Sequence, residues 1–334
     1  MTTGSQPKQP SQMGLKLQLR IFENMIWPID IIIYLMFSAL VPVGMLNRDL
    51  FVYMIYSSFP LGFIVLGEAM VLLSGNFDLS LGEVCGLSGM AGAFVATIGV
   101  LPTSLAPLSI FVPIIIGLGC GLLNALLVTR AGLNPFLATL GTSFAFQGAK
   151  LLVYPVSIFA GFPSIYLAIG GNEFFAFPIF LASLIILFLV LNRTRFGSAL
   201  YSTGSDAVAS EMVGIPTKSV IFWAFVIGGG LAGAAGLFFA GFMKSISPLT
   251  GDTEIFPAFA GAVLGGISLK GGRGNLLNVL GGILCLSYID FGLTMLAISP
   301  YIRIVLYGVL VVIAVFIDNL RGRIRERYMR ALRA

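Results

Sequence analysis

Residues Gly75 to Glu83 read GNFDLSLGE and stand between two apolar runs that are each long enough to cross a bilayer. A hydrocarbon core of about 30 Å needs roughly 20 apolar residues in a helix. Two carboxylates and an amide are costly in such a place unless they start a helix or line a polar path. The stretch therefore predicts a break between two membrane segments.

The composition is that of a membrane protein. Of 334 residues, 57% are hydrophobic and only 10% are charged, and the mean hydropathy is +1.00. A soluble domain carries about 25% charged residues. We therefore expect an all-α polytopic integral membrane protein, in which close helix packing uses the 41 glycines.

Apolar runs place the membrane segments along the chain. About ten are found, at 26–44, 51–73, 81–100, 108–128, 135–154, 174–192, 219–242, 257–269, 275–297 and 301–319. The eighth is too short for an upright span and rich in glycine, which is typical of broken or re-entrant helices that line a cavity. GGISLKGGRG, residues 265–274, is thus a partner for GNFDLSLGE, and such pairs indicate a transport path and an internal duplication of spans 2–5 and 7–10.

Basic residues follow the rule for cytoplasmic loops rather than the pattern of a nucleic-acid binder. Alternating the spans from a cytoplasmic amino terminus places both termini in the cytoplasm. The first 24 residues lack the apolar core and cleavage site of a signal peptide, so we expect the first span to direct insertion. We divide the chain into a cytoplasmic segment 1–24, one transmembrane domain 25–320 and a basic tail 321–334, which is predicted to lie as an amphipathic helix at the membrane lipid surface.

Residues 192–219 form the one sizeable polar loop, with a predicted coupling loop at about 193–218. Ser205 or Asp206 can cap a short helix from Ala207 to Met212, and Gly214 can end it. A connector and a docking element for a cytosolic partner are both compatible with this pattern. A polar helix bracketed by two glycines favours docking.

The chain offers little for catalysis. It has no histidine, its three cysteines lie in apolar runs, and no phosphate-binding loop G-x-x-x-x-G-K-[ST] occurs. We therefore expect no metal, no cofactor, no enzymatic activity and no nucleotide-binding site of its own.

Several polar residues fall within the predicted spans. For Asn124 and Gln147 an interhelical hydrogen bond is sufficient. Glu68 and Asp290 must lie near an interface, pair with a cation or be protonated. Ser80 and Glu83 match the S-x-x-E capping box, which leaves Asn76 and Asp78 unexplained.

A second polar cluster opens the span that begins near residue 135. Asn134 and Pro135 are ordinary at a helix start, whereas Thr139 and Thr142 share a helix face and are candidates to face a pore. The tentative substrate path consists of Asn76, Asp78, Ser80, Asn134, Thr139 and Thr142.

Five segments resemble the permease subunits of bacterial sugar ABC importers of the ribose, xylose, rhamnose and autoinducer-2 type. NFDLSLG resembles their G-I-D-L-S-V-G motif, and LNPFLATLGT resembles P-x-F-I-A-T-L-G. GSDAVASEMVGI is similar to their coupling segment, AVLGGISLKGGRGN to V-x-G-G-x-S-x-x-G-G-x-G, and residues 291–319 to their closing spans. The matches keep one order from residue 60 to 320. Departures at Asn76, Asp290, Glu68 and Glu83 leave the choice of sugar open.

The resemblance implies a permease that dimerises with an identical or related subunit in the inner membrane. It implies two cytosolic ATPase subunits and a periplasmic or lipid-anchored binding protein as partners. It gives the coupling role to the segment that contains Gly204, Ser205, Asp206, Ala207, Ala209, Glu211 and Gly214. It also places Asn76, Asp78, Leu79 and Ser80 near the translocation path.

The predicted function is thus ATP-driven import of a monosaccharide or similar polyhydroxylated solute. A nucleoside or branched-chain amino-acid permease is the nearest alternative. A secondary transporter coupled to ions through Glu68, Asp78 or Asp290 is a less favoured one, because it would work without an ATPase.

Overall fold

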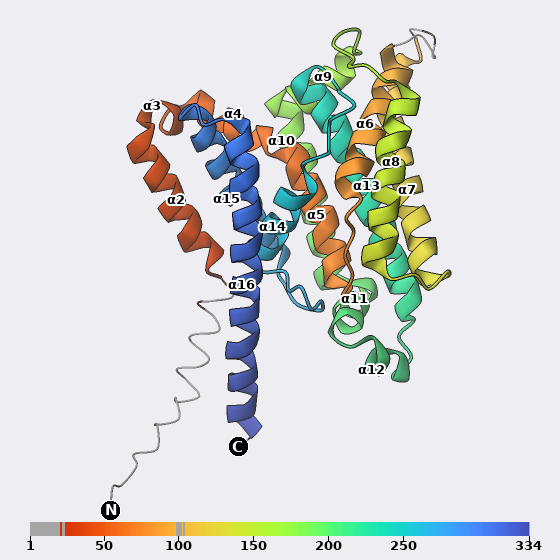
Figure 1. Cartoon of the computed structure of the whole chain (residues 1–334), viewed down its shortest axis with the longest axis vertical. Coiled ribbons are helices and arrows are strands. Elements are labelled where there is room, and N and C mark those ends of the chain that lie inside the picture. The colour runs from red at the N-terminus through yellow and green to blue at the C-terminus, as the bar shows by residue number, and fades with distance from the viewer. Residues whose placement is uncertain (1–20, 22–23, 98–101, 103, 334) are drawn as a thin grey trace, which may run out of the picture.

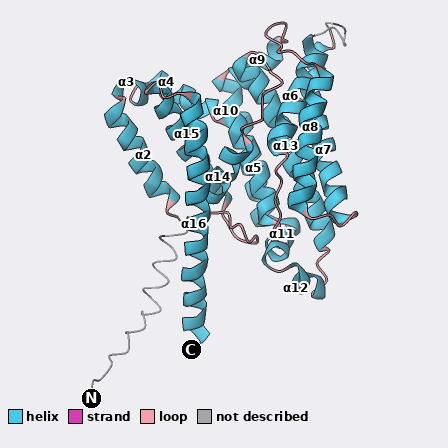
Figure 2. Ribbon diagram, viewed as in Figure 1, coloured by secondary structure: helices cyan, strands magenta, loops and turns pink. Residues whose placement is uncertain are grey.

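The structure, a computed structural model, describes all residues except 1–20, 22–23, 98–101, 103 and 334. The described residues form helices joined by loops, with one isolated antiparallel bridge between Ile158 and Ile246 (Figure 2). The predicted all-α polytopic membrane fold is confirmed.

Seven helical segments within the described part of the chain are long and apolar enough to span a membrane. They are α4–α5 (Arg48–Ser57 and Phe59–Leu73), η1–α7 (Ala106–Ile110 and Phe111–Thr129), α8 (Pro135–Val153), α10 (Glu173–Arg193), α13 (Thr217–Met243), α15 (Leu276–Met295) and the first part of α16 (Pro300–Arg333). Three shorter apolar helices are α2 (Ile26–Leu40), α6 (Leu81–Thr97) and α14 (Ile255–Leu264). Each predicted span overlaps one of these segments, and the short eighth one is α14.

The remaining helices are short connecting elements. They are α3 (Pro42–Met45), α9 (Ser164–Gly171), α11 (Arg195–Ser205) and α12 (Ala207–Met212). The polar loop 192–219 was predicted to hold one helix and in fact holds two. Thr194 caps α11 by accepting a hydrogen bond from Gly197 N, and this signal was overlooked. The basic tail is helical and continues α16.

Figure 1 shows two groups of helices, with α2, α3, α4, α15 and α16 on one side and α6, α7, α8 and α13 on the other. Helix α13 packs against α5, α6 and α7. Glycines make this possible, because a Cβ on Gly121 or Gly229 would collide with backbone atoms of the facing helix. Small residues at helix contacts are what packing in lipid requires.

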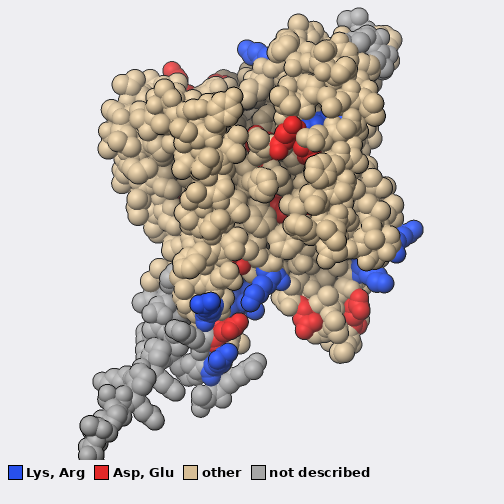
Figure 3. All heavy atoms as spheres, viewed as in Figure 1, with Lys and Arg blue, Asp and Glu red and all other residues tan. Residues whose placement is uncertain are grey.

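Charged side chains gather in two places on the face shown in Figure 3. Figure 3 shows Lys and Arg gathered at the end that carries α12 and the last turns of α16. It also shows acidic side chains inside the hollow between the two helix groups. Most of the remaining surface of this face carries no charged side chain, as expected of a membrane-spanning band.

Candidate functional site

The chain breaks between α5 and α6, as GNFDLSLGE predicts. Helix α5 ends at Leu73 and α6 begins at Leu81. Gly75 has φ +81, a left-handed conformation that a side chain would disfavour. The intervening residues form a turn whose polar groups face inward.

Asp78 is the centre of a buried hydrogen-bond network. Its Oδ1 accepts from Ser80 Oγ at 2.6 Å and from Ser80 N at 2.9 Å. Asn124 Nδ2 on α7 donates to Ser80 Oγ at 2.7 Å and lies 3.3 Å from Asp78 Oδ2. Thr142 on α8 donates to Asn124 Oδ1 at 2.7 Å. Asn124 thus makes the predicted interhelical bond, and the network ties the break to α7 and α8.

The predicted capping box does not form. Ser80 Oγ bonds to Asp78 and Asn124, and Asp78 rather than Glu83 accepts the Ser80 N–H. Glu83 turns instead toward Lys150. The local motif is overridden because tertiary partners reach both side chains.

The six predicted path residues do not gather around one cavity. Asp78, Ser80, Thr139 and Thr142 are buried, and Thr139 Oγ1 accepts from Leu79 N at 3.1 Å. Asn134 is exposed and caps α8 by accepting from two backbone N–H groups. The side chain of Asn76 bonds to Ser74 alone among the described residues. Their part in translocation stays a prediction.

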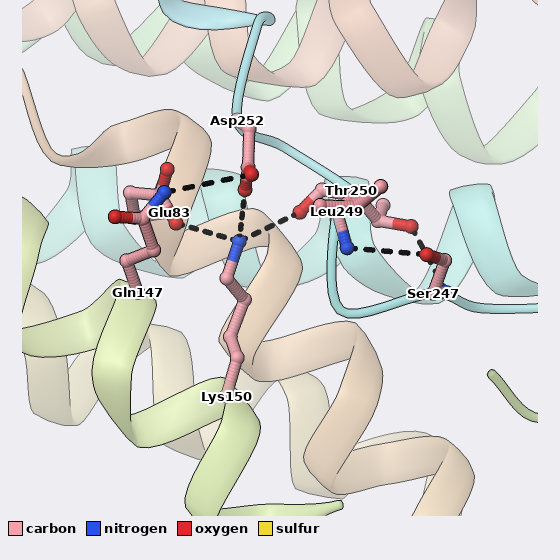
Figure 4. Close-up of polar contacts among 7 residues, drawn as sticks. All are labelled: Glu83, Gln147, Lys150, Ser247, Leu249, Thr250 and Asp252. Atoms are coloured by element: carbon pink, nitrogen blue, oxygen red, sulfur yellow. Dashed lines mark hydrogen bonds and ion pairs between the residues drawn. The ribbon is translucent and has the colours of Figure 1, made fainter. Parts of the chain in front are cut away.

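Lys150 lies at the centre of a second polar cluster (Figure 4). Its Nζ, fully shielded from solvent, is 2.6 Å from Glu83 Oε2 and 2.5 Å from Asp252 Oδ1. It also donates to the carbonyl oxygen of Thr250 at 3.1 Å. Gln147, one turn away on α8, points its amide toward Asp252. One cation therefore joins α6, α8 and the loop before α14.

The loop at Thr250 to Asp252 rests directly on α6. A Cβ on Gly86 would collide with the Thr250 carbonyl, and one on Gly251 with the Gly82 carbonyl. Gly251 also has φ +94. The backbone of the loop thus approaches α6 closely enough for Lys150 to reach both.

The Lys150 cluster was not predicted from the sequence. Its two acidic residues, Glu83 and Asp252, lie 67 and 102 positions from Lys150 in the chain. The available signal was a lysine in the last turn of a span and an aspartate in the facing loop.

Two other intramembrane carboxylates were candidates. Asp290 pairs with Arg303 at 3.1 Å and accepts from Tyr307 at 2.7 Å, so of the three arrangements left open for it the structure shows pairing with a cation. Glu68 is buried within α5, and its Oε2 has no partner among the described residues.

Three glycine-containing segments meet at the end that carries α12; we call this contact the glycine junction, formed by Gly75, Gly204, Gly271 and Gly272. Gly272 N donates to the carbonyl oxygen of Leu73 at 3.0 Å. A Cβ on Gly204 would strike that same carbonyl and the Gly272 amide. Figure 1 shows the loop after α14 reaching α11 here. The two broken segments paired by sequence are thus in contact.

Helix α12 projects beyond the glycine junction. It spans Ala207–Met212, as predicted, and Asp206 caps it by accepting from Ala209 N at 2.9 Å. Gly214 has φ +86 and ends it. Val208 and Met212 are 65% and 82% exposed, so the helix offers an uncovered surface with an apolar part. Glu211 accepts a hydrogen bond from Thr217, which ties α12 to the start of α13.

Comparison with known proteins gives consistent relatives. Residues 50–315 match the family described as branched-chain amino acid transport system / permease component. The chain is 30% identical to the ribose import permease protein of Bacillus subtilis, over 77% of this chain and 81% of the relative. It is 31% identical to the D-allose transport system permease protein of Escherichia coli, over 86% and 89%. An autoinducer 2 import system permease protein of Photorhabdus temperata is 28% identical over 76% and 78%. No solved structure matches.

Proposed function

Because the chain belongs to the branched-chain amino acid transport system / permease component family, we propose that it is the membrane subunit of an ATP-driven importer of a monosaccharide or similar polyhydroxylated solute. Support for the sugar class comes from the ribose, allose and autoinducer 2 relatives. The branched-chain amino-acid alternative rests on the family description alone and is not favoured.

The observation that carries the proposal is the position of α12. It is exposed, lies at the basic end of the molecule and follows directly on the glycine junction. A cytosolic ATPase needs an exposed docking surface of this kind, because its motion must reach the membrane helices through a rigid contact. We assign ATPase coupling to Gly204, Ser205, Asp206, Ala207, Ala209, Glu211 and Gly214.

The remaining assignments follow from this role. The chain lies in the inner membrane with its basic end facing the cytoplasm. Both termini lie on the cytoplasmic side. The partners are ATPase subunits, a substrate-binding protein and a second permease subunit, and the chain itself holds no nucleotide site. For translocation, the Asp78 network shapes the break between α5 and α6 beside the path.

Reconstitution into liposomes tests the proposal. The purified chain is combined with its cognate ATPase and binding protein, and uptake of radiolabelled ribose, allose and leucine is measured with ATP inside. We expect ATP-dependent sugar uptake that stops when the ATPase is omitted. Uptake by the chain alone under a proton or sodium gradient would overturn the proposal in favour of an ion-coupled transporter.

A further inference from the structure

A basic cavity of about 810 Å³ opens at the end of the molecule that carries the last turns of α16. Its walls are the loop between α14 and α15, Asn24 just before α2, Tyr201 and Ser205 of α11, Asn278 of α15 and the α16 turns from Asp318 onward. Five basic side chains line it: Lys270, Arg273, Arg321, Arg323 and Arg325. Among the described lining residues two are acidic, Asp318 and Glu326, so basic side chains outnumber acidic ones by three in this part of the chain.

Hydrogen bonds fix charged side chains and the loop around the cavity. Arg321 donates to the carbonyl oxygens of Val263 and Leu264, the last residues of α14, at 3.2 and 3.5 Å. Asp318 accepts from Leu269 N at 3.1 Å and fixes the loop. Burial and the nearby Arg325 lower the pKa of Arg273. An anion in the cavity would relieve this repulsion between guanidinium groups.

The surroundings indicate which kind of anion fits. The part of α16 that leads to the cavity is only 6% buried. Its exposed apolar side chains repeat at helical spacing and stop just before the basic residues: Val305, Val309, Val312, Ile313 and Phe316. Asn24, two residues before α2, lines the same cavity, and α2 exposes Ile31, Ile32 and Leu35. Apolar faces that end at arginines match the boundary between acyl chains and headgroups.

We propose that this cavity binds the phosphate headgroup of an anionic phospholipid, whose acyl chains lie along the exposed faces of α2 and α16. The bound headgroup contacts the loop that contains Lys270 to Gly274. Gly271 and Gly272 of this loop belong to the glycine junction. The bound lipid thereby steadies the contact between the two broken segments and the coupling segment.

Lipid retention measures this site without reference to transport. The detergent-purified chain is delipidated, mixed with phosphatidylglycerol, phosphatidylcholine or inorganic phosphate, and examined by native mass spectrometry. We expect one phosphatidylglycerol per chain and no retained phosphatidylcholine. The double variant Arg273→Gln/Arg325→Gln should weaken retention on the order of 30-fold, from two lost basic contacts.

The matched control is Arg130→Gln/Arg195→Gln, which removes two exposed charges outside the cavity. It should retain lipid as the unmodified chain does. Equal loss of phosphatidylglycerol retention in both double variants would mean that the lipid is held by general attraction to surface charge. That result would overturn the site. Retention of inorganic phosphate without retention of phosphatidylglycerol would show that the cavity binds a soluble anion instead of a lipid.

Thermal unfolding of each variant separates binding from folding. If Arg273→Gln/Arg325→Gln unfolds, the exposed pair Lys270→Gln/Arg323→Gln replaces it in the same assay. Undiminished retention in that folded variant would also overturn the proposal. Because this readout needs neither ATPase nor sugar, it can fail while the transport proposal stands, and the reverse.

Discussion

The Nζ atom of Lys150 lies 2.6 Å from Oε2 of Glu83, so an ion pair whose lysine is fully shielded from solvent joins α8 to α6. Removing one partner of such a pair leaves the other charge buried and costs about 3 to 5 kcal/mol. We expect Lys150→Met to lower the thermal unfolding midpoint in detergent markedly. Glu83→Gln/Lys150→Met should recover most of the loss, because Asp252 is partly exposed and can be solvated. Equal midpoints for the single and double variants would contradict this account.

Asp78→Ala should destabilise the chain by roughly 2 to 5 kcal/mol, because Ser80 and Asn124 would each lose a buried acceptor. Asn76→Ala is the control from the same turn and should change stability by less than about 0.5 kcal/mol, since its bonds are local and half-buried. Denaturant unfolding compares the two. A stable Asp78→Ala protein that no longer transports would instead place Asp78 in the path.

Gly204→Ala should separate the glycine junction. The added methyl group collides with the Leu73 carbonyl and the Gly272 amide, and backbone cannot rotate away as a side chain does. We expect ATP-dependent uptake to fall at least tenfold. Gly308→Ala, at a helical glycine with open space around it, should leave uptake unchanged and stabilise slightly. Unimpaired uptake by Gly204→Ala would show that the junction tolerates a gap.

Asp206→Lys/Glu211→Lys should abolish coupling at α12. The change removes the N-cap, worth about 1 kcal/mol, and reverses two charges on the exposed helix. The ATPase retained on the immobilised permease should fall by more than tenfold. Arg130→Glu reverses an exposed charge at the C-cap of α7, outside the loop 193–218, and serves as the control. Normal ATPase retention with Asp206→Lys/Glu211→Lys would remove α12 from the contact.

Local features of the fold were predictable from sequence. The bounds of α12 and its cap at Asp206 follow from side chains within three residues of each other. The two glycine-rich breaks were paired from their composition, whereas their direct contact was not predicted. By contrast, the Lys150 cluster joins positions far apart in sequence, and a lysine in an apolar run does not reveal which carboxylates it will meet. The capping box at Ser80 and Glu83 was wrong because nearby Asp78 accepts the Ser80 N–H, while distant Lys150 pairs with Glu83.

The glycine junction bears on how a movement of α12 would reach the membrane helices. Side chains at a contact can absorb a displacement of a few tenths of an ångström by small changes of their χ angles. Where Gly204 lies against Leu73 and Gly272, peptide groups touch with no side chain between them. We therefore expect a displacement of one of the three segments to be passed to the other two with little loss.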